Sequence, residues 1–234
     1  NIKNINDLSE SMVGCEIVYH WAAFLGVDEV AKNPIETMET ESIGTFNVIQ
    51  ACIKNKIKKI VYASTSGIYG KVDIDKAVQE DFKVSPSSSY AIAKRYNEIY
   101  LKSIFEEHGI ENFSLRYFNI YGPRQDTRMV IPRFFNQALK GDDIIVYGDG
   151  NQTRDFTYVD DTIKATIEIA NKCKGSEIIN ITKGEDITIL ELAEKIINLT
   201  KSSSKIKLVK NPSFRKDYEV EKRFGSSKKL ISLI

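Results

Sequence analysis

The sequence predicts an α/β protein built on a parallel β-sheet. Two observations lead to this class. Short apolar runs alternate with longer segments that carry apolar residues at three- and four-residue spacing, and polar or small residues follow several of those runs. Such alternation is typical of parallel sheets with right-handed crossovers. A chain of 234 residues suits one large domain, or one domain with a small lobe.

The first half of the chain alternates predicted strands with predicted helices. Pro34 suits the first turn of a helix, and apolar spacing continues that helix to about residue 55. A second helix is expected from about Ser89 to His108. Buried strands, some with an exit loop, are expected at 15–23, 58–66 and 112–122.

The second half is more mixed. Gly141 is expected to end one helix, and a strand, a glycine-rich turn and a second strand-like piece follow it. Asp160 or Asp161 is expected to cap the next helix, and Thr188 the one after that. These helices are expected at 131–141, 162–173 and 189–201, with strands at 176–182 and from 205, the last followed by an irregular charged loop. Two lobes that interleave in sequence are therefore expected.

Charge and cysteine content exclude several classes of protein. The 33 basic and 32 acidic residues leave a net charge of +1, so no global field recruits nucleic acid or an anionic membrane. Cys15, Cys52 and Cys173 lie far apart without a CxxC or Cys/His cluster, which argues against a metal site and a disulfide framework. No apolar run is long enough to span a bilayer, and the polar N-terminus does not resemble a signal peptide. A cytoplasmic protein is expected.

Tyr90 and Lys94 are four residues apart at the start of a predicted helix and therefore share one face. A phenol has a pKa of about 10 and is a poor base at neutral pH, but a nearby ammonium favours the phenolate. Lowering that pKa by roughly three units requires about 4 kcal/mol of charge interaction. Taken alone, the spacing is more often a solvated helical face than a catalytic pair.

Polar residues also follow two of the predicted strands. Thr65 lies in a small hydroxyl-rich segment after one strand, and Asn119 follows another. The carboxyl ends of parallel strands line the ligand crevice, so a hydroxyl and an amide there could contact a substrate. A turn that satisfies its own backbone is an equally good reading of Thr65 and a better one of Asn119 taken alone.

Two arginines are candidates for binding a phosphate. Arg154 follows a tight turn and precedes Asp155, and Arg215 lies in a charged loop. Arginine suits bidentate phosphate recognition, but a surface ion pair explains either residue as well.

In combination, these motifs resemble the extended short-chain dehydrogenase/reductase family, specifically its NAD-dependent nucleotide-sugar epimerases and dehydratases. The resemblance covers about residues 14–229. The matching segments are VYHWAA, NPIETMETESIGTFNVIQAC, KKIVYASTSGIYG, SSSYAIAKRYNEIY, LRYFNIYGPRQ, VIPRFFNQALKG, IVYGDGNQTRDFTYVDD and INITKGEDITILELA.

The resemblance implies a Rossmann-like NAD-binding domain with a smaller, interleaved α+β lobe that grips a nucleotide sugar, most simply a UDP-sugar. Residues 1–121 would be part of the Rossmann domain and 122–234 mainly the sugar-nucleotide lobe, with 156–185 returning to the first domain. The family's first strands and glycine-rich NAD loop have no counterpart in this sequence, which also begins with Asn. We therefore expect a fragment that alone binds NAD weakly and is inactive.

The resemblance also assigns roles to individual residues. Thr65, Tyr90 and Lys94 would be the catalytic Ser/Thr, Tyr and Lys, all beside the cofactor. Phe118 would lie near the nicotinamide. Trp21, Ala22, Ala23 and Phe24 would line the cofactor, and Asn119, Arg154 and Arg215 would hold the sugar nucleotide.

Small residues after Thr65 narrow the implied reaction. Dehydratases of the family carry Asp-Glu where Ser66-Gly67 stand, and UDP-glucuronate decarboxylases carry Glu at the position of Gly67. The chain therefore resembles the UDP-glucose 4-epimerase type. In that reaction Tyr90 would take the proton of the 4-hydroxyl while hydride passes from C4 to NAD, and hydride would return to the other face of a 4-keto sugar.

Three alternatives stay open: a 4,6-dehydratase, a UDP-glucuronate decarboxylase, or a non-catalytic relative that acts as a binding protein.

Glu41 is a further departure from the pattern of the family, which usually has Asn at this position. A buried carboxylate near a cofactor needs a partner. Many relatives are dimers, and the helices that begin near Pro34 and Ser89 would form a homodimer interface.

Overall fold

The computed structural model describes residues 1–24, 26–71, 76–211 and 222–234. Arg215, one of the expected nucleotide-binding residues, lies outside these ranges. Within the described residues, no helix is long and apolar enough to cross a membrane.

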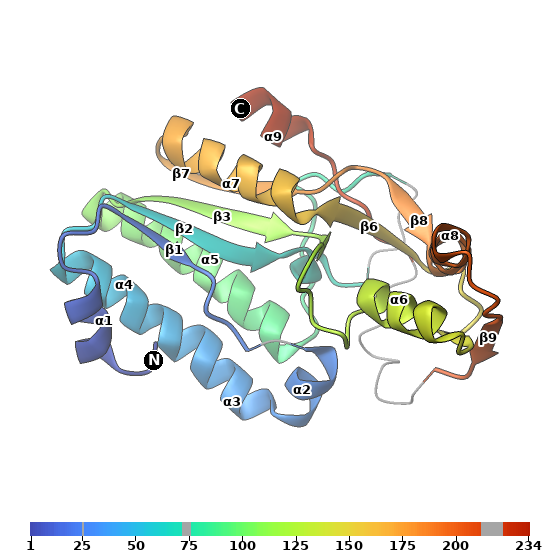
Figure 1. Ribbon diagram of the computed structural model, residues 1–234. Coiled ribbons are helices and arrows are strands. Elements are labelled where there is room, and N and C mark those ends of the chain that lie inside the picture. Colours follow the sequence, from blue (N-terminus) through green and yellow to red (C-terminus); the bar gives the residue numbers. More distant parts are fainter. Residues whose placement is uncertain (25, 72–75, 212–221) are drawn as a thin grey trace.

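A four-stranded parallel sheet forms the centre of the larger part of the molecule (Figure 1). Its order is β1-β2-β3-β7. The strands are β1 Ile17–His20, β2 Lys59–Thr65, β3 Glu111–Tyr117 and β7 Ser176–Ile181. Both faces of β2 and β3 are largely buried, which explains their continuous apolar character in the sequence. The predicted parallel α/β class is confirmed.

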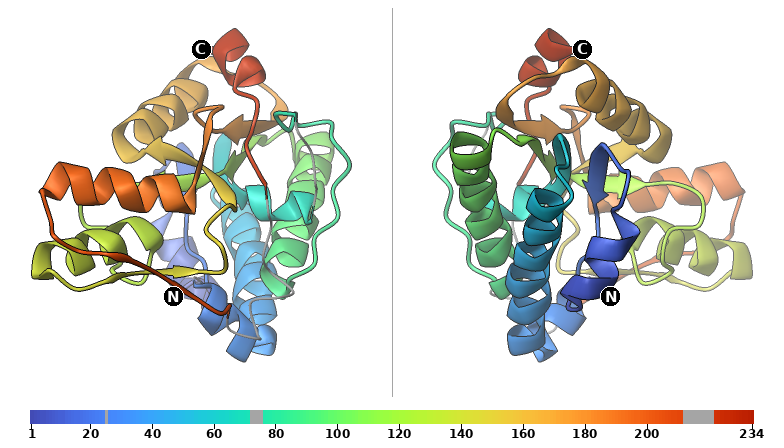
Figure 2. Two further views of the ribbon diagram at one scale, coloured as in Figure 1. Left: turned by 90° about the vertical axis from the view of Figure 1, so that its right-hand side faces the viewer. Right: turned by 90° about the vertical axis from the view of Figure 1, so that its left-hand side faces the viewer.

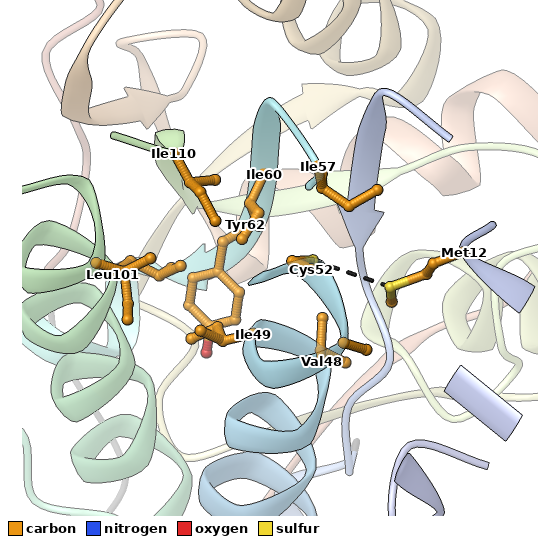
Figure 3. Packing of buried hydrophobic residues seen from close by; sticks show 11 residues of the cluster. Met12, Val48, Ile49, Cys52, Ile57, Ile60, Tyr62, Leu101 and Ile110 are labelled. Carbon is orange, nitrogen blue, oxygen red and sulfur yellow. Dashed lines mark hydrogen bonds between the residues drawn. The ribbon is translucent and has the colours of Figure 1, made fainter. Parts of the chain in front are cut away.

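Helices α1, α3, α4 and α5 cover one face of this sheet (Figure 1). Here Tyr62 of β2 points between Ile49 of α4 and Leu101 of α5, and Cys52 Sγ lies 3.9 Å from Met12 Sδ (Figure 3). The bounds on this side are α1 Ile5–Ser11, α2 Val27–Lys32, α3 Pro34–Met38, η1 Glu39–Ile43, α4 Gly44–Lys54 and α5 Ser89–His108.

The helix expected from Pro34 is confirmed, with a difference in its middle. The turn η1 between α3 and α4 is π-helical, so the chain winds more widely there than in an α-helix. Helix α5 has the predicted bounds. The Ser88 side chain caps it by accepting the Ala91 N–H at 3.1 Å, and Gly109 ends it in the left-handed conformation.

Helices α7 Val159–Lys172 and α9 Lys228–Leu233 lie on the opposite face of the sheet (Figure 1). The prediction that Asp160 or Asp161 caps α7 is wrong. Tyr158 is the N-cap, and both aspartates lie in the first turn, where their negative charge still suits the helix dipole.

A smaller lobe lies beyond the carboxyl ends of the main strands (Figures 1 and 2). Helices α6 and α8 pack together in it over the two parallel strands β5 and β9. Gly141 ends α6, and Thr188 caps α8 through a reciprocal capping box with Glu191, as predicted. The bounds are α6 Val130–Lys140, α8 Ile189–Thr200, β5 Ile144–Tyr147 and β9 Ile206–Val209.

The strand expected at 112–122 is divided at Phe118. Strand β3 stays in the main sheet, whereas the next segment joins a second sheet of order β4-β6-β8. Its strands are β4 Asn119–Tyr121, β6 Thr153–Tyr158 and β8 Asp186–Thr188. One sequence run thus supplies strands to two sheets.

Candidate active site

Five predicted site residues line a single cavity of about 300 Å³ at the carboxyl edge of the main sheet. They are Phe24, Thr65, Tyr90, Phe118 and Asn119. Strand β2 brings Thr65 to this edge, β3 ends just before Phe118, and the start of α5 supplies Tyr90. The ligand crevice of an open parallel sheet is expected in this position.

Thr65 is half-buried and caps the short 3₁₀-helix η2 Ser66–Tyr69. Its Oγ1 accepts the backbone N–H of Gly67 at 3.1 Å. The local-turn reading of this residue is therefore correct. The two readings are compatible, because a hydroxyl that accepts one hydrogen bond can still donate its own hydrogen to a ligand.

Tyr90 and Lys94 form an inward-facing pair, and the solvated-face reading is wrong. The Lys94 side chain is 1% exposed. Its Nζ lies 5.3 Å from the centre of the Tyr90 ring and 4.7 Å from that of Tyr62, which places the ammonium against two aromatic faces.

Burial dominates the ionisation of both groups. It raises the pKa of Tyr90 well above its usual value, and the nearby Glu41 carboxylate raises it further. Burial lowers the pKa of Lys94, although the charge of Glu41 and its contact with the ammonium act in the opposite direction. The phenol is therefore neutral at pH 7 in this state, and its pKa falls only if positive charge or hydrogen-bond donors are added or the negative charge of Glu41 is removed.

Glu41 is the buried carboxylate whose partner the sequence left open. Its Oε2 lies 3.0 Å from Lys94 Nζ, and its Oε1 accepts the backbone N–H of Phe24 at 2.7 Å. Asn97 donates to the Glu41 backbone carbonyl at 2.8 Å and to the Tyr62 hydroxyl at 2.8 Å. One residue of η1 therefore connects α5 with the loop after β1.

The residues expected along the cofactor divide into two groups. Phe24 reaches the cavity, but Trp21, Ala22 and Ala23 are not among its lining residues. Trp21 is 45% exposed and stacks on Tyr19 with ring centres 5.2 Å apart. The proposed contact of Trp21, Ala22 and Ala23 with a cofactor stays a prediction.

Asn119 and Arg154 lie in adjacent strands of the second sheet. Asn119 Nδ2 donates to the backbone carbonyl of Asp155 at 3.1 Å, which leaves its side-chain oxygen for other partners. Arg154 Nη1 donates to the Thr153 carbonyl at 2.7 Å. The Asp155 carboxylate accepts from Thr182 Oγ1 and from the N–H groups of Lys183, Gly184 and Gly225.

Sequence reasoning did not find Arg223, which also lines the cavity. Its Nη2 donates to the Gly70 carbonyl at 2.5 Å, whereas its buried Nε has no hydrogen-bond partner within the described part of the chain. Burial and the nearby positive charge of Arg154 lower the pKa of Arg223 to about 10. Two guanidinium groups held near each other favour an anionic ligand. The segment EKRFGSS offers no motif that marks this residue.

A decarboxylase is among the curated relatives of this chain. The UDP-N-acetyl-alpha-D-glucosaminuronate decarboxylase of Bacillus cytotoxicus is 42% identical over 213 residues, which cover 88% of this chain and 66% of the relative. A putative UDP-glucose 4-epimerase of Methanocaldococcus jannaschii is 38% identical over 181 residues, which cover 76% and 58% respectively. The chain thus spans less than two thirds of the length of each relative.

Solved structures of similar fold include the UDP-glucose 4-epimerase of Thermotoga maritima with UDP-glucose. Its TM-score is 0.92 at 30% identity, and the alignment covers 99% of this chain and 75% of that one. Residues 1–182 match the family described as the NAD dependent epimerase/dehydratase family. The chain therefore belongs to the NAD-dependent epimerase/dehydratase family, within the extended short-chain dehydrogenases/reductases.

Proposed function

We propose that the natural protein containing this chain is an NAD-dependent nucleotide-sugar 4-epimerase. The observation that carries this proposal is the meeting of Thr65 and Tyr90 in one cavity, with the buried Lys94 ammonium against the Tyr90 ring and small residues next to Thr65. This arrangement supports oxidation of a sugar hydroxyl, and Ser66 and Gly67 stand after Thr65 in place of a pair of carboxylates that could eliminate water.

The residues present fit the nicotinamide half of the cofactor. The cavity combines aromatic walls from Phe24 and Phe118 with the hydroxyls of Thr65 and Tyr90. A mostly apolar pocket with a few polar groups suits a flat ring attached to a ribose. When bound, the cofactor supplies the acceptor and donor of the hydride.

The side chains of this chain supply proton transfer and orientation. The Tyr90 phenolate takes the proton of the sugar 4-hydroxyl and later returns it. Thr65 donates a hydrogen bond that holds the same oxygen, and the Lys94 charge favours the phenolate. Asn119, Arg154, Arg223 and Arg215 supply polar and positive groups for the nucleotide diphosphate.

Gly67 supports the epimerase over the related dehydratases and decarboxylases. A Cβ at this position would lie 3.3 Å from Thr65 Oγ1 and 3.7 Å from Ala91 Cβ. Its backbone is not in the left-handed region, so a side chain there requires only a small adjustment of its neighbours. Glycine is therefore not imposed by the turn, and this position next to Thr65 carries no carboxylate.

A nucleotide-sugar decarboxylase is the second candidate, favoured by the 42% identity to the Bacillus enzyme. Both reactions begin with oxidation at C4, so Tyr90 has the same role in both. The two reactions differ in their later steps, because decarboxylation requires a carboxyl group on the sugar and releases carbon dioxide.

The deciding experiment uses four substrates: UDP-glucose, UDP-N-acetylglucosamine, UDP-glucuronate and UDP-N-acetylglucosaminuronate. Proton NMR of the sugar products distinguishes a C4 epimer from a shortened sugar, and trapped carbon dioxide gives an independent measure. An epimer without carbon dioxide supports the proposal. Carbon dioxide release from either uronate supports the second candidate. No turnover of any of the four would favour a non-catalytic binding protein.

We also propose the domain division 1–121 and 122–234, with 156–185 in the first domain. β7 of that segment pairs with β3 in the main sheet, which supports the return of the chain to the first domain.

A homodimer through α4 and α5 is proposed from their exposed apolar side chains, among them Phe46 and Ile99. Ile99→Lys is expected to convert a dimer to a monomer in sedimentation velocity.

A further inference from the structure

The buried ion pair between Glu41 and Lys94 is next to the proposed catalytic tyrosine. The Glu41 and Lys94 side chains are 0% and 1% exposed. The carboxylate and the ammonium are 3.0 Å apart, and the ammonium also lies over the Tyr90 ring. Water cannot screen the carboxylate and the ammonium from each other, so each charge strongly affects the other and the phenol beside them.

The position of Glu41 is fixed from several directions. Its second oxygen is bound by the Phe24 N–H, and its backbone carbonyl is bound by Asn97. The wide turn η1 carries it inward from between α3 and α4. These contacts hold the carboxylate beside Lys94.

The electrostatic consequence is a competition for Lys94. An isolated ammonium would stabilise a phenolate on the same helical face. A carboxylate at contact distance cancels most of that charge, and it also repels the phenolate directly. The proposed general base is therefore surrounded by a local charge balance that disfavours its active, ionised form.

We propose that Glu41 is a positioning residue that holds the Lys94 ammonium in a buried ion pair and thereby limits its electrostatic support of the Tyr90 phenolate. This inference rests on the proposed function for the role of Tyr90 as the base. It assigns Glu41 the role of setting how readily that base ionises before substrate arrives.

The other titratable groups around the pair do not supply the same effect. Burial and the charge of Lys94 lower the pKa of His20, on β1, to about 3, so His20 is neutral at physiological pH. Burial raises the pKa of Tyr62, on β2, so Tyr62 is neutral as well. Glu98, on α5, is neutralised by Arg116 at 2.9 Å. Arg223 lines the cavity with Tyr90 and would favour the phenolate.

The test is a pH titration of the Tyr90 phenolate by its ultraviolet absorbance, in the natural protein without added substrate. The signal of Tyr90 is isolated by subtracting the same titration of a Tyr90→Phe counterpart for each protein. In Glu41→Gln, the phenolate should form at a pH at least about one unit lower than in wild type, a tenfold change in the ionisation constant. Because absorbance detects only the phenolate, loss of a proton from Lys94 does not mimic the result.

Three further variants separate charge from structure. Glu41→Asp keeps the carboxylate and should titrate close to wild type. Glu41→Asn removes it with a shorter side chain and should titrate like Glu41→Gln, which preserves the test should the Gln variant fail to fold. Glu39→Gln is the matched control, since Glu39 belongs to the same turn but forms an exposed ion pair with Lys3.

Equal or higher midpoints in the two neutral variants would overturn the proposal. The absence of a Tyr90 phenolate from wild type and from both neutral variants, up to the pH at which they unfold, would overturn it equally. The titration requires no turnover. A failure of the substrate panel would therefore refute the proposed function while leaving the Glu41 measurement independent of it.

Discussion

His20 should make the stability of this protein depend on pH below neutrality. It is 4% exposed at the end of β1, where its Nε2 lies 2.9 Å from Thr45 Oγ1. Burial, followed by the charge of Lys94, lowers the pKa of His20 from 6.5 to about 3. Replacing the imidazole with a neutral amide in His20→Gln should remove this dependence.

The direction of the effect is set by proton binding in the two states. Between pH 6.5 and about 3 the unfolded chain binds a proton at His20 and the folded chain does not. The stability contributed by the neutral imidazole is therefore complete above 6.5 and falls as the pH decreases. Within this window, each pH unit changes the free energy of unfolding by about 1.36 kcal/mol. Lowering the pH from 6.5 by about 1.5 units, to about 5, should therefore reduce the free energy of unfolding by about 2 kcal/mol.

Urea denaturation at pH 7 and at about pH 5 measures this cost. Wild type should lose about 2 kcal/mol more than His20→Gln on acidification, because other titrating groups contribute equally to both proteins. His108→Gln is the control, since His108 is exposed in the last turn of α5. Identical losses in wild type and His20→Gln would refute the assignment of a buried neutral imidazole.

Three further predictions concern the site and its support. Tyr90→Phe should abolish turnover of the accepted nucleotide sugar and leave NAD binding, measured by calorimetry, nearly unchanged; retained turnover would remove Tyr90 from the mechanism. Glu98→Gln should lower the free energy of unfolding by about 3–5 kcal/mol in urea, because it leaves the Arg116 guanidinium buried without its carboxylate; a loss below about 1 kcal/mol would contradict this. Gly70→Ala should destabilise by more than about 2 kcal/mol, since Gly70 has φ +74° and an added Cβ would meet the Ser85 carbonyl oxygen; a Tm equal to wild type would refute it.

Local patterns in the sequence were sufficient to predict most elements of the fold. Helix α5 and its bounds follow from periodicity and a terminal glycine. The division of the strand run at Phe118 was not predictable, because apolar residues continue across the break and only tertiary pairing separates the two sheets. Tyr158 replaced the expected aspartates as the cap of α7 because the chain enters this helix directly from β6.

The candidate site was predictable where its residues belong to recognisable motifs. Thr65, Tyr90 and Asn119 are such residues, and the structure brings them to one cavity. The pairing of Glu41 with Lys94 could not be read from the sequence, because it joins two elements that are distant along the chain. Arg223 was missed because it lies far along the chain from the other residues of the cavity and belongs to no recognisable motif.

The wide turn η1 also sets the rotational phase between α3 and α4. Each residue of an α-helix advances the chain by about 100°, and a π turn accommodates one residue more than an α turn. Val48 and Cys52 fix α4 in the core. If the same residues were wound as a regular α-helix instead, the preceding helix would rotate by about 100° against this fixed end. Such regular winding would shift the carboxylate of Glu41 away from Lys94 without altering either side chain, so the width of this turn is itself a determinant of charge at the active-site edge.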